Sequence, residues 1–344
     1  MAKIFRNPRL LLLSRSPNWS FPLIGVNSRS IETLAYEEIN SSTNDETPKK
    51  ATIFFLHGLL GSGRNWRSFS RNLASVLSKS SSSPIGLKSG LWIVDWRMVL
   101  VDLRNHGRSA EIKGLEPPHD LVNAARDLAD LVKSRGWAWP DAVIGHSMGG
   151  KVALQFAQSC GAGDYGESTI LPKQLWVLDS VPGEVEARDS DGEVEKVLQT
   201  LQSLPTLIPS RKWLVDHMMS LGFSKSLSEW IGSNLKKSGD HETWAFNLEG
   251  AGEMFKSYCE TSYWPLLEHP PKGLEIAVVR AENSDRWSPN VVQQLENIAS
   301  RRKSEDEGRT SVHVLPRSGH WVHVDNPKGL LEIMAPSMTI LPLA

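Results

Sequence analysis

Residues 145–149 constrain the fold more than any other stretch of this sequence. They read Gly-His-Ser-Met-Gly, and they lie between the apolar run 142–144 and the helix-favouring run 150–157. An apolar run, a sharp turn and then a helical pattern indicate a buried strand that leads into a helix. Glycine two places on either side of Ser147 indicates a turn too tight for side chains at those positions. The pattern predicts a strained turn that exposes the Ser147 hydroxyl at a helix amino end, where the dipole favours negative charge.

Strand-like runs alternate with helix-like runs along the rest of the chain. The predicted strands are an edge strand at 32–39 and buried strands at 51–56, 98–102, 142–144, 175–178, 276–279 and 311–315. The predicted helices cover 65–77, 120–135, 150–157 and 291–300, and a last helix begins at 327. Such alternation predicts an α/β fold with a mostly parallel central sheet and helices on both faces. The turns that follow the strands would then share one edge of the sheet, where ligands bind.

The chain divides into four predicted segments. Residues 1–31 contain five basic residues and no acidic one, which is typical of an organelle transit segment. Arginine dominates there and Arg29-Ser30 resembles a matrix-processing site, so we expect the mitochondrion, with the chloroplast as the alternative. The core would comprise 32–183 and 271–344. Residues 184–270 are too long for a simple connection, and we expect a helical cap or lid.

Composition excludes several classes of protein. The 344 residues include 38 Lys and Arg against 39 Asp and Glu, so no basic surplus suggests nucleic acid. Two distant cysteines, Cys160 and Cys259, make neither a disulfide framework nor a C-x-x-C metal site. The ten histidines are scattered, and no metal or organic cofactor is implied. No apolar run is long enough to span a bilayer, and the oligomeric state is left open.

Four motifs together resemble the α/β-hydrolase superfamily. They are His-Gly-Leu-Leu-Gly-Ser at 57–62, Asp-Leu-Arg-Asn-His-Gly-Arg-Ser at 102–109, Gly-His-Ser-Met-Gly-Gly at 145–150 and Gly-His-Trp-Val-His at 319–323. More narrowly, they resemble the branch of alpha/beta-hydrolase domain-containing protein 11 and its small bacterial esterase relatives. The resemblance covers roughly residues 51–340. It implies a serine esterase or thioesterase, and in that branch often a mitochondrial location.

Ser147 and His320 are the expected nucleophile and base. A serine hydroxyl needs a base within hydrogen-bond reach, and His320 follows the last predicted strand. Two backbone N–H groups, of Met148 and Leu59, are expected to form the oxyanion hole. The other polar residues of the motifs are expected to support the turns rather than to react; they are His57, Gly107, Arg108 and His146.

Two aspartates compete for the acid of the triad. The usual superfamily pattern places Ser284 at the acid position, and Asp285 comes one residue later. Asp179 instead directly follows the predicted strand 175–178, the next strand after the helix at 150–157. Some members of the superfamily have their acid at this position. A carboxylate at a strand end stands on a rigid element. We therefore favour Asp179 and keep Asp285 as the alternative acid.

The cap predicts an apolar substrate. Eight cap residues are expected to offer an apolar wall, namely Trp213, Leu214, Met218, Met219, Phe223, Trp230, Trp244 and Trp264. The predicted function is a serine hydrolase that cleaves a small-molecule carboxyl ester or thioester of an apolar acyl group through an acyl-enzyme on Ser147. Two alternatives remain: an acyltransferase that uses the same residues, or a ligand- or partner-binding protein whose chemistry is vestigial.

Overall fold

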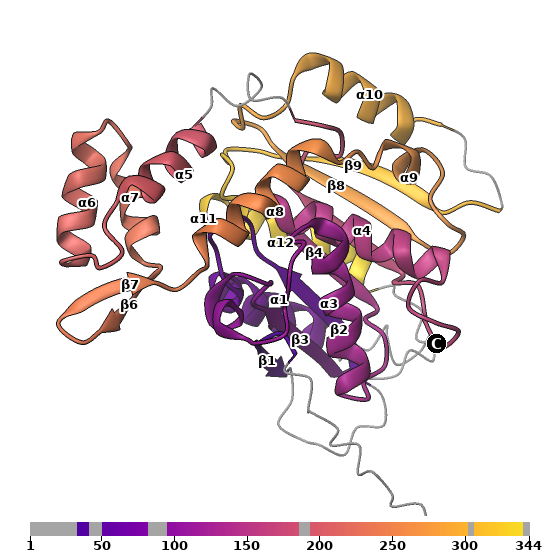
Figure 1. Ribbon diagram of the computed structural model, residues 1–344. Helices are drawn as coiled ribbons and strands as arrows, with labels where there is room; N and C mark the ends of the chain where they lie inside the picture. The colour runs from indigo at the N-terminus through magenta and orange to yellow at the C-terminus, as the bar shows by residue number, and fades with distance from the viewer. Residues whose placement is uncertain (1–32, 41–49, 82–94, 186–192, 302–305, 340–344) are drawn as a thin grey trace, which may run out of the picture. The chain divides into compact units, whose positions relative to one another are not determined.

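A seven-stranded sheet organises the computed structural model, which describes residues 33–40, 50–81, 95–185, 193–301 and 306–339 (Figure 1). The strand order is β1-β3-β2-β4-β5-β8-β9. The strands are β1 (Tyr36–Asn40), β2 (Lys50–Leu56), β3 (Asp95–Val101), β4 (Ala142–His146), β5 (Gln174–Leu178), β8 (Glu275–Ala281) and β9 (Arg309–Leu315). Only the edge pair β1 and β3 is antiparallel in this sheet, and the other neighbours run parallel. The predicted mostly parallel sheet is confirmed, with its first strand at the edge.

Two helical layers bury the two faces of the sheet. In β2, Phe54 and Leu56 pack with the helices α3 (Leu121–Ser134) and α4 (Met148–Ala162). Ile53 and Phe55 alternate with them and pack on the other face, with α1 (Arg67–Ser81) and α12 (Pro327–Met338). Successive side chains of a strand point to opposite faces, so a strand buried on both sides reads as one apolar run. This is why β2 has no polar alternation in sequence.

The predicted helices form, and capping side chains set where several of them begin. The side chain of Asp120 accepts a hydrogen bond from Asn123 N at the start of α3. Ser288 caps α10 (Pro289–Ala299) in the same way. The predicted helix at 65–77 begins as a short 3-10 helix, η1 (Gly63–Trp66), and continues as α1. Side chains that accept bonds from free N–H groups of the first turn stabilise helix starts by about 1 kcal/mol.

The segment between β5 and β8 contains both helices and strands. We call residues 184–270 the cap segment. Its described elements are α5 (Glu193–Ser203), α6 (Arg211–Ser220), α7 (Lys225–Gly232), β6 (Leu235–Ser238), β7 (His241–Trp244), α8 (Leu248–Glu260) and α9 (Trp264–Glu268). The expected helices are present, and the segment also contains a strand pair: β6 and β7 pair antiparallel around the turn at Gly239, whose φ is +62°. A positive φ suits glycine in such turns.

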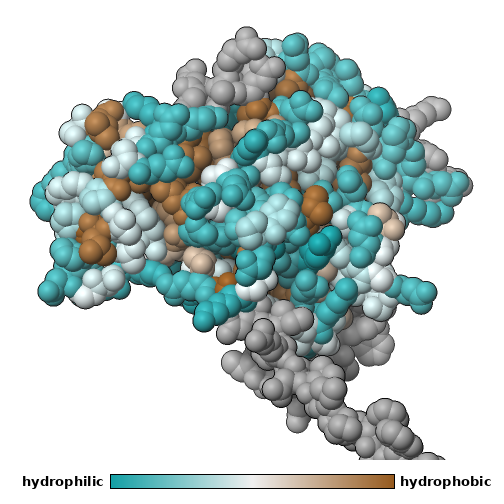
Figure 2. Space-filling model, in the orientation of Figure 1, coloured by the Kyte–Doolittle hydropathy of each residue, from teal (hydrophilic) through white to brown (hydrophobic). Residues whose placement is uncertain are grey.

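The cap segment has its own small apolar core. Leu201, Leu214 and Met218 are fully buried in it, together with Ile231. Apolar side chains also reach its surface, where Leu207, Met219 and Leu221 are exposed. Figure 2 shows brown apolar patches on the side of the molecule where Figure 1 places α6 and α7.

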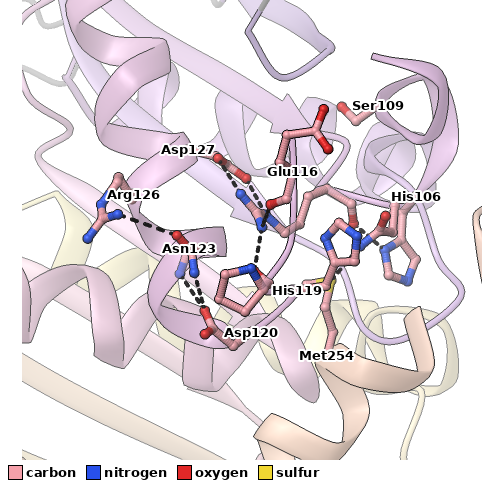
Figure 3. A network of polar contacts seen from close by, with 12 residues as sticks. His106, Ser109, Glu116, His119, Asp120, Asn123, Arg126, Asp127 and Met254 are labelled. Carbon is pink, nitrogen blue, oxygen red and sulfur yellow. Dashed lines mark hydrogen bonds and ion pairs between the residues drawn. The ribbon is translucent and has the colours of Figure 1, made fainter. Parts of the chain in front are cut away.

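A buried ion pair fixes the segment after β3. The Arg104 guanidinium binds both carboxylate oxygens of Asp127 on α3, at 2.6 and 2.9 Å. It also donates to the main-chain oxygens of Glu116 and Pro118, and Figure 3 shows this network beside Asp127. Arg104 is only 4% exposed, and each of its three guanidinium nitrogens has an acceptor, as a buried cation requires. The network ties the loop that follows β3 to α3.

The predicted transit segment, residues 1–31, lies outside the described residues, so its role stays a prediction. No described helix is long and apolar enough to cross a membrane. No group of three or more His, Cys, Asp or Glu side chains in the described residues could hold a metal ion.

Candidate active site

The turn after β4 has the strained geometry that the sequence predicts. Ser147 has φ +52° and ψ −123°, and it precedes the first turn of α4. A Cβ on Gly145 would lie 2.1 Å from the carbonyl oxygen of Gly149, and one on Gly149 would lie 2.6 Å from that of His57. Contacts under 3.0 Å with backbone atoms cannot be relieved by a rotamer change, so both positions require glycine. The serine is thereby held half-buried at the sheet edge, on a rigid turn.

Asp179 and His320 are brought together at this edge. His320 Nδ1 donates to Asp179 Oδ2 across 2.7 Å, although the residues are 141 positions apart. Asp179 is completely buried and follows β5 directly, with a φ of +42°. Its N–H bonds to Val279 O on β8, at 2.7 Å. The Asp179 carboxylate is thus fixed at the end of β5. This strand lies between β4, which leads into Ser147, and β8, which leads into the loop with Asp285.

Four donors hold the Asp179 carboxylate. Besides His320, they are Ala281 N at 2.9 Å, Trp287 Nε1 at 2.6 Å and Ser284 Oγ at 2.7 Å. Ser284, which occupies the usual acid position of the superfamily, therefore donates to Asp179. Asp285, the alternative acid, is exposed and lines the cavity, and among the described residues it makes no ion pair with His320.

The electrostatics of the pair follow from burial and hydrogen bonds. Burial alone would raise the pKa of Asp179, but the bonds from His320, Ala281 N and Trp287 outweigh it and lower this pKa below its ordinary value. Burial, and then the positive charge of Arg286, lower the pKa of His320, and these effects exceed the opposing effect of Asp179. A neutral His320 beside an ionised Asp179 can accept a proton at its free Nε2.

Ser147 and His320 line the same cavity, but no hydrogen bond joins their side chains within the described structure. Such bonds are often long before substrate binds. His146 contacts His320: its Nε2 donates to His320 O at 2.7 Å, and the centroids of the two rings are 4.6 Å apart.

Two free backbone N–H groups border Ser147. Leu59 and Met148 line the cavity, and their N–H groups make no hydrogen bond among the described residues. The loop that carries Leu59 lies against the turn at Ser147, because a Cβ on Gly58 would be 3.2 Å from Ser147 Cβ. His57 stabilises this loop, as expected: its Nδ1 donates to Gly58 O at 2.8 Å and its Nε2 accepts from Leu103 N at 3.0 Å.

Gly107 and Arg108 have the structural role that the sequence predicts. Asp102 accepts from Gly63 N at 2.7 Å and from Arg108 N at 3.0 Å, which joins the loops after β2 and β3. Gly107 has φ +52°, and a Cβ there would lie 2.6 Å from Asp102 Cγ. Side chains at this crossing would separate the two loops, so glycine is required.

The cavity above Ser147 has about 1040 Å³ of empty space, including its open mouth. Its apolar wall consists of Leu60, Val194, Val197, Leu227, Trp230, Phe255, Tyr258 and Trp321. Of the eight cap residues expected there, only Trp230 lines it. The prediction was wrong for the others for two reasons: Leu214, Met218 and Phe223 fill the core of the cap segment, and Met219 is exposed.

The remaining three tryptophans make other contacts. Trp213 stacks on His217 at 5.1 Å and Trp244 stacks on Phe246 at 5.1 Å. Trp264 lies against Gly183, where a Cβ would be 2.4 Å from its Nε1. Composition located the apolar region, but not which side chains turn toward the cavity.

Sequence reasoning missed the roles of four side chains around the site. Trp287 and Ser284 donate to Asp179, and Arg286 lines the cavity between them in the chain. Lys151, on α4, is fully buried, and its Nζ donates to the main-chain oxygens of Gly183, Tyr258 and Thr261. No local sequence pattern identifies these roles. The partners of Lys151, for example, lie 32 to 110 residues away along the chain.

The sheet order, the strained serine turn and the acid–histidine pair define an α/β-hydrolase fold. The model of the Alpha/beta hydrolase family matches residues 53–333, and the chain belongs to this family. The mouse protein named sn-1-specific diacylglycerol lipase ABHD11 is 23% identical over 339 residues, covering 96% of each chain. The Escherichia coli esterase YbfF is 23% identical over 86% of this chain and 95% of its own.

A solved structure shows the same fold. The marine microorganism esterase superposes with a TM-score of 0.66 at 21% identity, over 88% of this chain and 98% of its own. The expected resemblance to the branch of alpha/beta-hydrolase domain-containing protein 11 and bacterial esterases is confirmed by these relatives.

Proposed function

We propose that this protein is a serine hydrolase that cleaves carboxyl esters or thioesters of an apolar acyl group. The observation that carries the proposal is the hydrogen bond from His320 to the buried Asp179, because His320 and Ser147 line the same cavity. The names of the relatives, a lipase and an esterase, support ester cleavage.

In the proposed reaction, Ser147 Oγ attacks the carbonyl carbon of the substrate while His320 Nε2 takes the serine proton. Asp179 keeps the other ring proton on Nδ1 and stabilises the imidazolium. The oxyanion receives hydrogen bonds from the N–H groups of Leu59 and Met148. His320 then protonates the leaving group, and an acyl-enzyme on Ser147 remains. Water, activated by His320, attacks the acyl-enzyme and releases the acid.

The cavity wall supports an apolar acyl group. Trp230, Phe255 and Val197 line the cavity that Ser147 also lines. Burial of an apolar group contributes about 0.8 kcal/mol for each methylene. We therefore propose that residues 184–270 act as a cap that contributes much of the acyl site. Position 147 is serine, and epoxide hydrolases and haloalkane dehalogenases need an aspartate nucleophile there.

A fluorophosphonate probe tests the nucleophile. We expect wild-type protein to be labelled once, and Ser147→Ala to lose the label while it keeps its circular dichroism spectrum and Tm. Ser220→Ala is the matched control, because this exposed cap serine bonds only to His217 O among the described residues, and we expect full labelling. Labelling of folded Ser147→Ala, or a folded wild-type protein that is never labelled, would refute the assignment. The second result would favour the vestigial binding protein.

Activity on acyl esters and thioesters of graded chain length tests the substrate class. We expect kcat/KM to rise with acyl length until the cavity is filled. Adding an alcohol acceptor separates hydrolysis from acyl transfer: free acid as the dominant product supports a hydrolase, and a new ester as the dominant product supports the acyltransferase alternative.

A further inference from the structure

Arg286 brings a cationic side chain into the proposed catalytic cavity. It belongs to the loop between β8 and α10, directly after Asp285, and it lines the cavity together with His320 and Tyr258. It is partly buried. Its charge also reaches the base, because it is the largest influence on the pKa of His320 after burial. The guanidinium is therefore part of the space in which the substrate reacts.

This guanidinium has no partner within the described structure. It makes no hydrogen bond and no ion pair there, and its Nε is fully shielded from solvent without an acceptor. The buried Arg104 shows the contrast, since it binds both oxygens of Asp127 and two carbonyl groups. A buried donor without a partner is destabilising, and in native proteins such a group often has a functional reason.

The position of Arg286 also opposes the proposed chemistry. His320 must become positively charged when it takes the proton of Ser147, and a second cation nearby disfavours that state. Arg286 lowers the pKa of His320 and also contributes to lowering that of His146. An anion bound to Arg286 would remove this repulsion at the moment when the imidazolium forms. An anionic substrate would then gain both in binding and in reaction rate.

We propose that Arg286 is an anion-recognition residue of the active site, and that the preferred ester or thioester carries a carboxylate or similar anionic oxygen group. The inference rests on the proposed function. Guanidinium is suited to the role, because its planar donors match the two oxygens of a carboxylate. The apolar wall then binds the methylene chain of the same substrate. The preferred substrate is thus apolar along its length and charged at one point.

Two carboxylates line the same cavity and must be considered with this cation. Asp285 and Glu193 are both exposed, and neither forms an ion pair with Arg286 in the described residues. Asp285 raises the pKa of His320, opposite to the effect of Arg286. Because both acids repel an anion, the guanidinium is the group among these three that can bind the charge of the substrate.

Two pairs of substrates test the inference and locate the charge. The first pair places it in the acyl group: p-nitrophenyl hydrogen adipate against the neutral p-nitrophenyl methyl adipate. The second pair places it in the leaving group: the butyrate ester of para-hydroxybenzoate against that of its methyl ester. For each pair, the ratio of kcat/KM values is compared between wild type and variants, so that the intrinsic reactivities of the substrates cancel.

We expect Arg286→Gln to lower the anionic-to-neutral ratio about 10- to 100-fold in one of the two pairs, as a charge-assisted hydrogen bond predicts. Arg286→Lys keeps the charge and should retain part of the preference. Arg301→Gln, the same loss of charge at an exposed position, should change nothing. With neutral esters, the acid limb of the pH profile of Arg286→Gln should move to higher pH, because removing the cation raises the pKa of His320.

The outcomes separate this inference from the proposed function. Neutral esters that are hydrolysed equally by wild type and Arg286→Gln, with unchanged ratios in both pairs, would overturn the role of Arg286 and leave the serine hydrolase intact. A folded wild-type protein that neither labels at Ser147 nor cleaves any ester would overturn both. Equal Tm values of the variants exclude misfolding as the cause of a changed ratio.

Discussion

Replacement of Asp179 by asparagine is the sharpest test of the proposed acid. The carboxylate accepts four hydrogen bonds, from Ala281 N, Ser284 Oγ, Trp287 Nε1 and His320 Nδ1. An amide offers one acceptor oxygen, which can replace only one of the two carboxylate oxygens. With its oxygen toward Ala281 and Trp287, the new NH₂ group would face the ring of His320.

That orientation would place the wrong tautomer in the site. His320 Nδ1 would accept a hydrogen bond from the amide N–H, so the ring proton would sit on Nε2, where the proton of Ser147 must arrive. The loss in known triads of this kind is about 10⁴ in kcat. We expect Asp179→Asn to lower kcat by two to four orders of magnitude, which corresponds to about 3–5 kcal/mol of transition-state stabilisation.

Stability must be measured alongside activity. In this orientation the Ser284 hydroxyl loses its acceptor, and a donor without an acceptor costs about 1–3 kcal/mol, so the variant should lose about that much of its free energy of unfolding. Kinetic assays should therefore be run well below the Tm found by circular dichroism, and active sites should be counted with fluorophosphonate. Asp285→Asn is the matched control with the same change of charge at an exposed position, and we expect about a tenfold loss or less.

A folded Asp179→Asn variant that keeps kcat within tenfold of wild type would refute the reasoning. If Asp285→Asn lost kcat by orders of magnitude instead, the acid would belong to the loop after β8, as in the usual superfamily pattern.

Four further outcomes follow from the geometry. Gly145→Ala should lower the free energy of unfolding by at least about 4 kcal/mol or yield no folded protein, because its Cβ would meet a carbonyl oxygen at 2.1 Å. Gly252→Ala is the control: it has open space around it and should change the free energy of unfolding in chemical denaturation by about 1 kcal/mol or less. Lys151→Met should lower the free energy of unfolding by about 2–5 kcal/mol, since three buried carbonyl groups lose their donor. The acid-limb pKa in kcat/KM should lie below histidine's ordinary value of about 6.5, because burial and a nearby cation lower the pKa of His320, and only its neutral form accepts a proton. A fusion of residues 1–40 to a fluorescent protein should enter mitochondria; a cytosolic or plastid signal would contradict this.

Local patterns predicted the parts of this fold that local physics determines. The apolar run of β2 and the glycines around Ser147 are fixed by burial on both faces and by contacts with nearby backbone. The cap segment was harder, because helical and extended conformations compete in short amphipathic stretches. The β6–β7 pair depends on the positive φ of Gly239, and a single glycine is a weak signal.

Long-range partners could not be predicted in the same way. Lys151 follows the serine turn on a helix, and in sequence it is typical of an exposed position. In the structure it is fully buried and donates to the carbonyl oxygen of Gly183, just before the cap segment, and to that of Thr261 within it. Arg104 and Arg286 are likewise indistinguishable by residue type, although one has a complete set of partners and the other has none in the described residues.

The strand order explains why Asp179 rather than Asp285 meets His320. In this sheet β5 lies between β4 and β8. Asp179, which follows β5, therefore lies between Ser147, which follows β4, and the loop that follows β8. Ser147 N bonds to Leu178 O at 3.0 Å on one side, and Asp179 N bonds to Val279 O at 2.7 Å on the other. The loop after β8 then turns across the end of β5, and it contributes Ser284 and Trp287 as donors instead of an acid. A carboxylate at Ser284 would face Asp179 and repel it, so a short hydroxyl there is what the position of Asp179 requires.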